Sequence, residues 1–329
     1  MKILCVAGSR GERAKLSPVI AALEGEHEVA CAYASHPGQV PTWDADARPP
    51  DALALEIAQP TPALRIGAVM RWVEPLLEER GSDILLTCGA SDAALGAAVA
   101  ASLAGIVGAH LDAGVVAANG NLNARLLEQS AVFLLAPNVA AAQRLAHRGM
   151  ENATCLCGDT LADSFDPAGA PAEAPAEPYV LCYLGGAALG ANALPAVLGA
   201  LERIGRVALL PAAPEAQARL EGAPAAQRET VRVIPPLDYS AMQAAVAGAS
   251  LVITDSPTLQ RESYFRATVA VGLAPSDFPE AESAGWVRRV APEEAAILEA
   301  ARAPAPEAPP EIEAHRGAGA RAARFVTGL

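Results

Sequence analysis

KILCVAGSRGERAKLSPVIAAL, residues 2–23, is the stretch that decides the fold. Its first part, Ile3–Ala7, is a continuous apolar run, which is typical of a strand buried on both faces of a parallel sheet. Gly8 and Ser9 break the run, and apolar residues then return at helical spacing up to Leu23. The stretch therefore predicts a buried strand, a tight turn and a helix, which together make a β–α unit.

The same alternation continues along the chain. Strands are expected at Ile3–Ala7, Glu28–Tyr33, Asp83–Thr87, Ile106–His110, Val132–Ala136, Ala153–Cys157, Tyr179–Leu184, Val207–Leu210, Val231–Ile234, Leu251–Thr254 and Val269–Leu273. Helices are expected near Glu12–Leu23, Pro62–Glu79, Ser91–Leu103, Val139–His147, Ala193–Arg203, Tyr239–Ala247 and Glu311–Val326. Because the strands are continuously apolar, the pattern favours an α/β fold with parallel sheets covered on both faces.

Two proline-rich stretches, Asp166–Pro178 and Ala303–Pro310, interrupt the alternation and are expected to be linkers. We therefore predict a first domain, a linker, a second domain, and a second linker with a C-terminal helix that crosses back to the first domain; their bounds are residues 1–165, 166–178, 179–302 and 303–329. Two such domains would place the carboxyl ends of their strands around a shared cleft, where ligands of parallel sheets usually bind.

The composition limits the kinds of partner and compartment. With a net charge of −13 over 329 residues, the chain lacks the positive face that nucleic acid or an anionic membrane would demand. Its six cysteines lie in or beside apolar runs, so we expect buried free thiols in a reducing compartment and no zinc site. The N-terminus lacks the pattern of a signal peptide, and Gly105 splits the longest alanine-rich stretch into a helix and a strand. We expect a cytoplasmic protein without a cofactor.

A basic cluster follows the first predicted strand. Arg10, Arg13 and Lys15 are crowded into six residues of an otherwise acidic chain, directly after the turn Gly8-Ser9. A tight turn before a helix N-terminus, with cations nearby, suits a phosphate or pyrophosphate. The alternative is that Arg10 and Lys15 only decorate a surface helix.

A second turn of this kind lies in LVITDSPTLQRES, residues 251–263. Ser256 is a good N-cap and Pro257 suits the first helical position, so a helix N-terminus would be ready for an anion. Gln260 and Glu262 follow in the first turns of that helix. The alternative is that Ser256 simply caps its own helix.

Together these segments resemble the non-hydrolysing UDP-N-acetylglucosamine 2-epimerases. VAGSRGERAKLSPVI resembles the opening "GTRPE…K..P" of that family, and TDSPTLQRE resembles its "TDSGG.QEE" turn. Further resemblances follow in order along the chain, in DILLTCGASDAAL ("HGDT"), GAHLDAG ("GHVEAG"), LCGDTLADS ("TGNT..D"), IPPLDYSAM ("PLDY"), DFPEAESAG ("ERPE...AG") and the final RGAGARAARFV.

The resemblance implies two Rossmann-like domains in the glycosyltransferase-B arrangement, and UDP or a UDP-N-acetylhexosamine as partner. By matching positions, Arg10 and Ser256 would hold the diphosphate, and Glu262 would accept both ribose hydroxyls. Backbone around Pro236–Tyr239 would meet the uracil. The residues assigned to UDP are Arg10, Lys15, Leu237, Ser256, Gln260 and Glu262. A second copy of the chain, in a homodimer, is a further candidate partner.

The sugar end of the site departs from the family pattern. The "HGD" histidine and aspartate are replaced by Cys88 and Ala90, and the "VEAG" glutamate by the shorter Asp112. Other family acids, arginines and histidines fall on positions that lack them, at Gly120, Asn121, Ala124, Ala212 and within Tyr183–Gly190. Proline stands in the "SGG" segment, where it removes a backbone donor.

Three candidate catalytic residues remain. Asp112 and His110 keep family positions, although a histidine that closes a buried strand is often structural. Asp92 would replace the lost acid if its loop shifted, but it is more readily interpreted as the cap of the following helix. The leading hypothesis is a UDP-sugar-binding enzyme of the 2-epimerase type with altered or weak catalysis. The alternatives are a non-catalytic UDP-sugar-binding homologue and a glycosyltransferase on the same scaffold, with Asp112 as its base.

Overall fold

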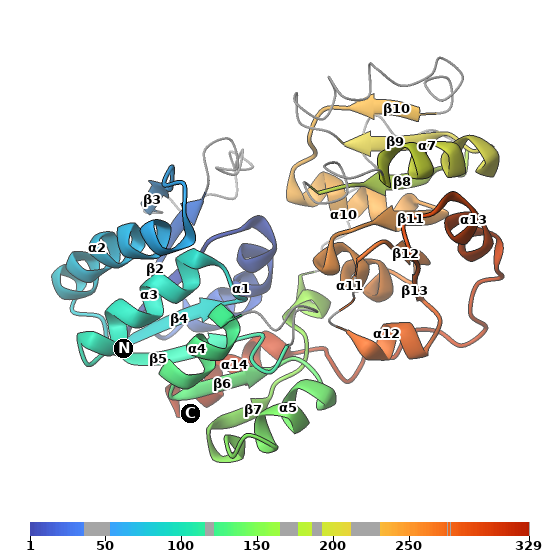
Figure 1. The fold of residues 1–329 in the computed structure, drawn as a ribbon. Coiled ribbons are helices and arrows are strands. Elements are labelled where there is room, and N and C mark those ends of the chain that lie inside the picture. Colours follow the sequence, from blue (N-terminus) through green and yellow to red (C-terminus); the bar gives the residue numbers. More distant parts are fainter. Residues whose placement is uncertain are drawn as a thin grey trace. The chain divides into compact units, whose positions relative to one another are not determined.

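The computed structural model (Figure 1) describes residues 1–35, 53–115, 122–164, 177–185, 193–211, 231–274, 276 and 278–328. Some expectations therefore lie outside the described residues. They concern Gly120, Asn121, Ala212, residues 186–190 and most of the 166–178 linker.

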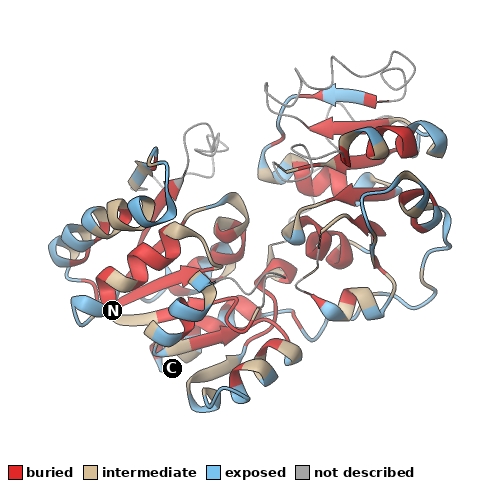
Figure 2. Cartoon of the chain, in the orientation of Figure 1, coloured by how far each residue is buried: buried red, intermediate tan, exposed pale blue. Residues whose placement is uncertain are grey.

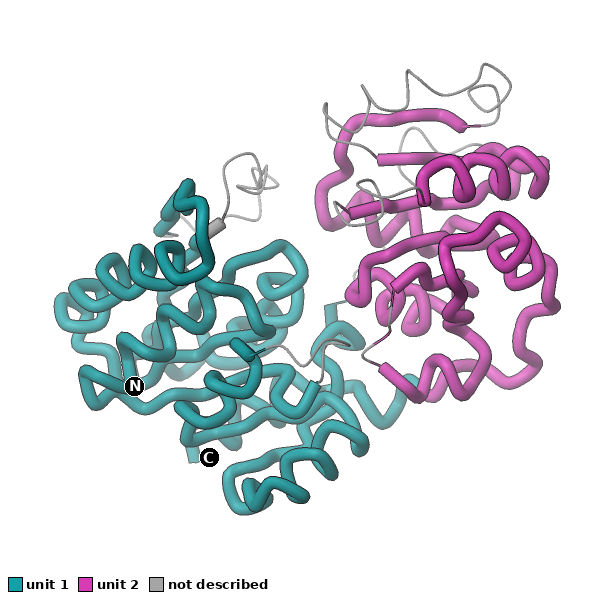
Figure 3. The backbone as a smooth tube through the Cα atoms, in the orientation of Figure 1, with its two compact units in different colours: residues 1–164, 312–329 teal, residues 165–311 magenta. Residues whose placement is uncertain are grey.

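The chain divides into two compact units (Figure 3). Unit 1 comprises residues 1–164 and 312–329, and unit 2 comprises residues 165–311. Unit 2 is thus inserted between the main part of unit 1 and its last helix.

Unit 1 is built on a parallel sheet with the strand order β3-β2-β1-β4-β5-β6-β7. Its strands are β1 (Lys2–Ala7), β2 (Glu28–Ser35), β3 (Leu53–Glu56), β4 (Ile84–Cys88), β5 (Val107–Leu111), β6 (Phe133–Ala136) and β7 (Thr154–Leu156). Its helices are α1 (Arg10–Leu23), α2 (Pro62–Arg80), α3 (Asp92–Leu103), α4 (Leu122–Ser130), α5 (Val139–Ala146) and α14 (Ala318–Thr327), with 3₁₀ turns η1 (Glu151–Ala153) and η2 (Thr160–Asp163).

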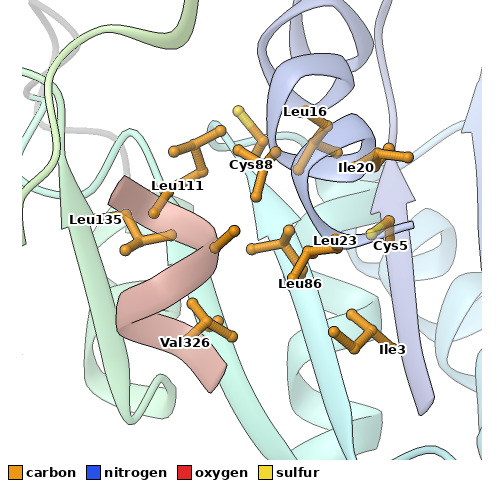
Figure 4. Packing of buried hydrophobic residues seen from close by; sticks show 14 of the residues in the cluster. Ile3, Cys5, Leu16, Ile20, Leu23, Leu86, Cys88, Leu111, Leu135 and Val326 are labelled. Atoms are coloured by element: carbon orange, nitrogen blue, oxygen red, sulfur yellow. The ribbon is translucent and has the colours of Figure 1, made fainter. Parts of the chain in front are cut away.

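Both faces of the sheet are buried at its central strands β1 and β4, as their apolar sequences predicted (Figure 2). Side chains of a strand alternate between faces, and β1 shows the division: Ile3 and Cys5 join a core with α1 and α14, while Leu4 and Val6 join a core with α2 and α3. Figure 4 shows Val326 of α14 pointing into the first of these cores. The last helix therefore completes one layer of unit 1.

Unit 2 has a second parallel sheet, in the order β10-β9-β8-β11-β12-β13. Its strands are β8 (Val180–Tyr183), β9 (Ala208–Pro211), β10 (Val231–Ile234), β11 (Leu251–Thr254), β12 (Ala270–Gly272) and β13 (Val287–Arg289). Its helices are α7 (Ala193–Ile204), α10 (Tyr239–Gly248), α11 (Pro257–Phe265), α12 (Pro279–Ser283) and α13 (Glu294–Arg302). The expected α/β fold with parallel sheets is confirmed in both units.

The expected final helix was wrong at its start. The helix begins at Ala318 rather than Glu311, because Gly317 adopts a left-handed conformation with φ 73°. The carboxylate of Asp163 accepts hydrogen bonds from the backbone N–H groups of Gly317 (2.7 Å) and Gly319 (2.8 Å). A side chain from η2 thus caps the helix, which sequence spacing does not reveal.

Within the described ranges, no helix is both long enough and apolar enough to cross a membrane. The six cysteines are free, and all but the half-buried Cys155 are buried.

Candidate functional site

The first candidate site lies at the carboxyl edge of the unit 1 sheet, where β1 and β4 are neighbours. The strand order reverses between them, so the turns that follow these two strands lie side by side, at the place where ligands of such sheets usually bind. The two turns are in close contact: a Cβ atom on Gly8, after β1, would lie 2.4 Å from Oγ of Ser91, after β4. A larger residue at position 8 would therefore crowd the two turns.

Glu12, on the first turn of α1, ties these two turns together. Its Oε2 accepts hydrogen bonds from the Gly8 N–H (2.7 Å) and from the Ser91 hydroxyl (3.0 Å), and its Oε1 accepts one from the Ser91 N–H (3.2 Å). The side chain is buried, and burial raises the pKa of Glu12 to about 7, although these hydrogen bonds and the charge of Lys15 lower it. Ser9 caps α1 by accepting from the Glu12 N–H (3.2 Å).

The turn after β1, where a phosphate seat is expected, also carries hydrogen bonds within the protein. The Gly8 N–H donates to the Glu12 carboxylate, and the Ser9 hydroxyl accepts from the Glu12 N–H. Arg10, the first residue of α1, is half-buried beside this turn. Arg10 thus provides a cation beside this turn, whereas the Gly8 N–H already donates a hydrogen bond to the Glu12 carboxylate.

Lys15, predicted to bind UDP, and Asp112, predicted to be catalytic, are brought together. Lys15 Nζ lies 2.5 Å from Asp112 Oδ2, and the two side chains are only 7% and 6% exposed. Asp112 directly follows β5 and has φ 65°, a left-handed conformation that few residues other than glycine adopt. Such backbone strain clusters at functional sites. The pair places a fixed carboxylate at the end of β5.

His110 lies two residues earlier, on β5, and is 2% exposed. Its Nδ1 is 3.1 Å from the hydroxyl of Thr87 on β4. Burial lowers the pKa of His110 to about 4, despite the opposing charges of Glu128 and Asp112. The lowered pKa favours a neutral imidazole at neutral pH.

Asp92 is not the cap of α3, as its position had suggested. Ser91 is the cap, and its Oγ accepts from the Ala94 N–H (3.1 Å). The carboxylate of Asp92 instead pairs with Arg65 of α2 (Nε to Oδ2, 2.7 Å) and accepts from Asn123 of α4 (2.9 Å). Asp92 is thus an ion-paired acid at the turn after β4, near the carboxyl edge of the sheet.

The second candidate site is the corresponding switch point of unit 2, between β8 and β11. Asp255, after β11, accepts a hydrogen bond from the N–H of Gly185, after β8 (2.6 Å). Ser256 caps α11 by accepting from the Leu259 N–H (3.3 Å), and Pro257 is the first helical residue; both expectations are confirmed. A half-buried hydroxyl and a nine-residue helix thus meet at this edge.

The other residues assigned to UDP in unit 2 are buried. Gln260 is 0% exposed, and its amide donates to the Ala274 carbonyl (3.3 Å) and packs against Gly272. Glu262 is 3% exposed, and its charge acts on Arg266 one turn further along α11. The side chain of Leu237 is buried, which leaves its backbone as the part that a ligand would meet.

The sequence analysis did not identify Glu12 or Asp255, although a sequence motif marks Glu12. Ser9-Arg10-Gly11-Glu12 has the S-x-x-E spacing of a capping box, which starts the helix at Arg10 rather than near Glu12. The box is only half formed, because the carboxylate extends to Gly8 and Ser91. No local pattern marks Arg65 or Asn123, since their partner Asp92 is distant in the chain.

Solved structures similar to this chain include 2-epimerases and a glycosyltransferase. The chain is 19% identical to the UDP-GlcNAc 2-epimerase of Methanocaldococcus jannaschii in complex with UDP-GlcNAc and UDP, with a TM-score of 0.83 over 100% of both chains. It is 18% identical to the Neisseria meningitidis enzyme bound to UDP-GlcNAc (TM-score 0.80; 100% of this chain, 99% of that one). A glycotransferase of kitacinnamycin matches at 16% identity (TM-score 0.61; 98% and 95%). At these identities the likeness is one of fold, and it confirms the glycosyltransferase-B-like architecture.

A comparison with curated protein sequences gives no significant match. The family model described as UDP-N-acetylglucosamine 2-epimerase, however, matches residues 34–326. Since this range covers most of both units, from the second strand of unit 1 to the last helix, the chain belongs to the UDP-N-acetylglucosamine 2-epimerase family.

Proposed function

We propose that the protein binds UDP or a UDP-N-acetylhexosamine and that its epimerase chemistry is altered or weak. Family membership supports the ligand class. In unit 2, the half-buried Ser256 at the N-terminus of α11 supports an anion site. In unit 1, the resemblance assigns Arg10 to a phosphate group of the ligand. The sugar end of the ligand would then meet the groups at the ends of β4 and β5.

One observation carries the proposal of weak chemistry: both candidate acids are ion-paired. Asp112 pairs with Lys15 and Asp92 pairs with Arg65. Inverting the configuration at C2 requires a base to remove a proton from one face and an acid to return one to the other. Each carboxylate therefore already has a cationic partner within the protein, and this partner competes with a substrate proton for its oxygens. With His110 buried and neutral, this constellation offers little proton transfer.

The experiment is proton NMR of UDP-GlcNAc incubated with the protein in D₂O. We expect the C2 proton signal to be lost very slowly or not at all, and UDP-ManNAc signals to stay weak. Interconversion at an ordinary enzyme's rate, about 1–1,000 per second, would contradict the proposal. New anomeric signals on an added acceptor sugar would instead indicate glycosyl transfer.

Binding is tested separately by the thermal unfolding of the protein with UDP. A ligand that binds only the folded state raises the midpoint of unfolding. We expect UDP to raise it, and Arg10→Ala to reduce the rise, because a charge-assisted contact of about 1.5–3 kcal/mol is lost. Arg80→Ala at the end of α2 is the matched control and should respond to UDP as the wild type does. An unmoved transition at millimolar UDP would exclude the nucleotide site.

A further inference from the structure

At each switch point a carboxylate of the protein accepts a hydrogen bond from the N–H of a glycine that follows the first strand of the unit. Gly8 donates to Glu12 in unit 1 (2.7 Å), and Gly185 donates to Asp255 in unit 2 (2.6 Å). Backbone N–H groups at such turns are good anion donors. In unit 1 the Glu12 carboxylate also accepts two hydrogen bonds from Ser91, so it connects the turn after β1 to the turn after β4.

The Glu12 carboxylate is held more closely than packing alone requires. A Cβ atom on Gly89 would lie 2.7 Å from Glu12 Oε1, so the turn after β4 passes directly against the carboxylate. That turn is held from other sides too, since Asn123 of α4 donates to the Ala90 carbonyl (3.3 Å) and Arg65 of α2 pairs with Asp92. Glu12 is the residue of α1 that holds the turn after β4, through its hydrogen bonds with Ser91.

Stability does not explain why this group is an acid. Burial disfavours the ionised form and raises the pKa of Glu12, so at and above neutral pH its charge costs the folded state free energy. Perturbed carboxyl groups of this kind cluster at functional sites. Among the described residues, Lys15 of α1 is the charged group whose field acts on Glu12, and Asp112 faces Lys15 from the turn after β5.

We propose that Glu12 is a positioning residue whose carboxyl group locks the turn after β1 to the turn after β4 and so fixes Arg10 and Asp92 relative to each other. The lock itself is independent of the ligand. Its consequence for UDP rests on the proposed function, because Arg10 is the residue assigned to the diphosphate.

The test is chemical rescue. Glu12→Ala removes the anion but leaves the Gly8 N–H, the Ser91 N–H and the Ser91 hydroxyl as a vacant nest. We expect formate to raise the midpoint of thermal unfolding of this variant, whereas chloride at equal ionic strength does not. Glu26→Ala, an exposed glutamate after α1, is the matched control and should not respond to formate. A Glu12→Ala protein that formate leaves unchanged would overturn the proposal.

UDP binding gives the second readout. We expect Glu12→Ala to weaken UDP by about tenfold, the effect of one lost hydrogen bond, and formate to restore much of the affinity. If wild-type protein does not bind UDP, the proposed function fails, but the effect of formate on unfolding still decides the role of Glu12.

A further measurement covers the case in which Glu12→Ala does not fold. In ¹⁵N-glycine-labelled wild-type protein, the Gly8 amide should titrate near neutral pH, because its acceptor changes charge there. The isosteric Glu12→Gln variant should lack this titration. A Gly8 amide that does not titrate in the wild type, or that titrates equally in both proteins, would contradict the assignment.

Discussion

Lys15 of α1 and Asp112 after β5 form a buried ion pair, with 2.5 Å between Nζ and Oδ2. The two residues are far apart in the sequence, and their charges neutralise each other at the carboxyl edge of the unit 1 sheet. A cation that looks available in the sequence is therefore already committed to an acid. Breaking such a pair leaves one buried charge uncompensated.

Replacing Lys15 alone should thus be more harmful than replacing both partners. Lys15→Met should lower the free energy of unfolding by about 3–5 kcal/mol, measured by urea denaturation. Lys15→Met with Asp112→Asn should recover much of this loss, since asparagine tolerates the left-handed backbone at position 112. Lys2→Met is the control, because Lys2 and Glu28 form an exposed pair (3.8 Å) of the kind worth at most about 1 kcal/mol. If Lys15→Met and Lys2→Met lowered the free energy of unfolding equally, the result would contradict a buried Lys15–Asp112 pair.

His110 should make the protein sensitive to acid. Between about pH 4 and pH 6.5 the unfolded chain binds a proton at this position and the folded chain does not, so stability falls as the pH falls through this range. The loss attributable to His110 approaches about 3 kcal/mol at pH 4. His110→Asn should lose correspondingly less stability than the wild type in urea unfolding at successive pH values. The exposed control His147→Asn should keep the wild-type dependence.

Glu12 should act in the opposite direction. Its folded pKa of about 7 exceeds the ordinary value of 4.5, so the folded state binds the extra proton and stability falls as the pH rises through this window. Relative to Glu12→Gln, the wild type should lose up to about 3 kcal/mol between about pH 4.5 and pH 7. The pH ranges over which Glu12 and His110 change stability overlap, and their effects have opposite signs. Removing one of the two groups should therefore make the pH dependence that is caused by the other easier to measure. A constant difference between wild type and Glu12→Gln across this range would show that Glu12 titrates normally.

Two glycine-to-alanine substitutions should have opposite effects on the stability of the protein. Gly8→Ala places a Cβ atom 2.4 Å from Ser91 Oγ, which overpacks the two turns and should cost about 1–3 kcal/mol. Gly67→Ala, within α2, meets no atom within 4 Å and should stabilise the protein by about 0.5–1 kcal/mol. Thermal unfolding of both variants measures the contrast. A neutral Gly8→Ala would mean that the turns separate readily.

Glu262 should distinguish the nucleoside from its phosphates. If this residue accepts the ribose hydroxyls, Glu262→Ala should weaken UDP while leaving the affinity for inorganic pyrophosphate unchanged, as measured by calorimetry. Glu299→Ala, exposed on α13, controls for the loss of one negative charge in the same unit. Equal weakening of both ligands would show instead that Glu262 holds α11 in place.

The fold followed from the sequence because its signals are local. Apolar runs such as Leu251–Thr254 and caps such as Ser256 depend on neighbouring residues, and both were predicted at the right positions. The partners of Asp92 and Lys15 were not predicted, because each pair joins elements that only the strand order brings together. The strand β3, which is short and half-exposed, and the helix α4 were missed as well. Local chemistry therefore predicted the scaffold, and the topology decided which charges meet.

The position of α14 also bears on the order in which the protein is made. Ala322 and Val326 of this helix belong to the same core as Leu16 of α1, yet the whole of unit 2 lies between them in the chain. During translation the first unit to leave the ribosome therefore waits, with part of its apolar layer uncovered, until the second unit has been synthesised. We therefore expect unit 2, whose residues are contiguous, to be the first unit to become complete.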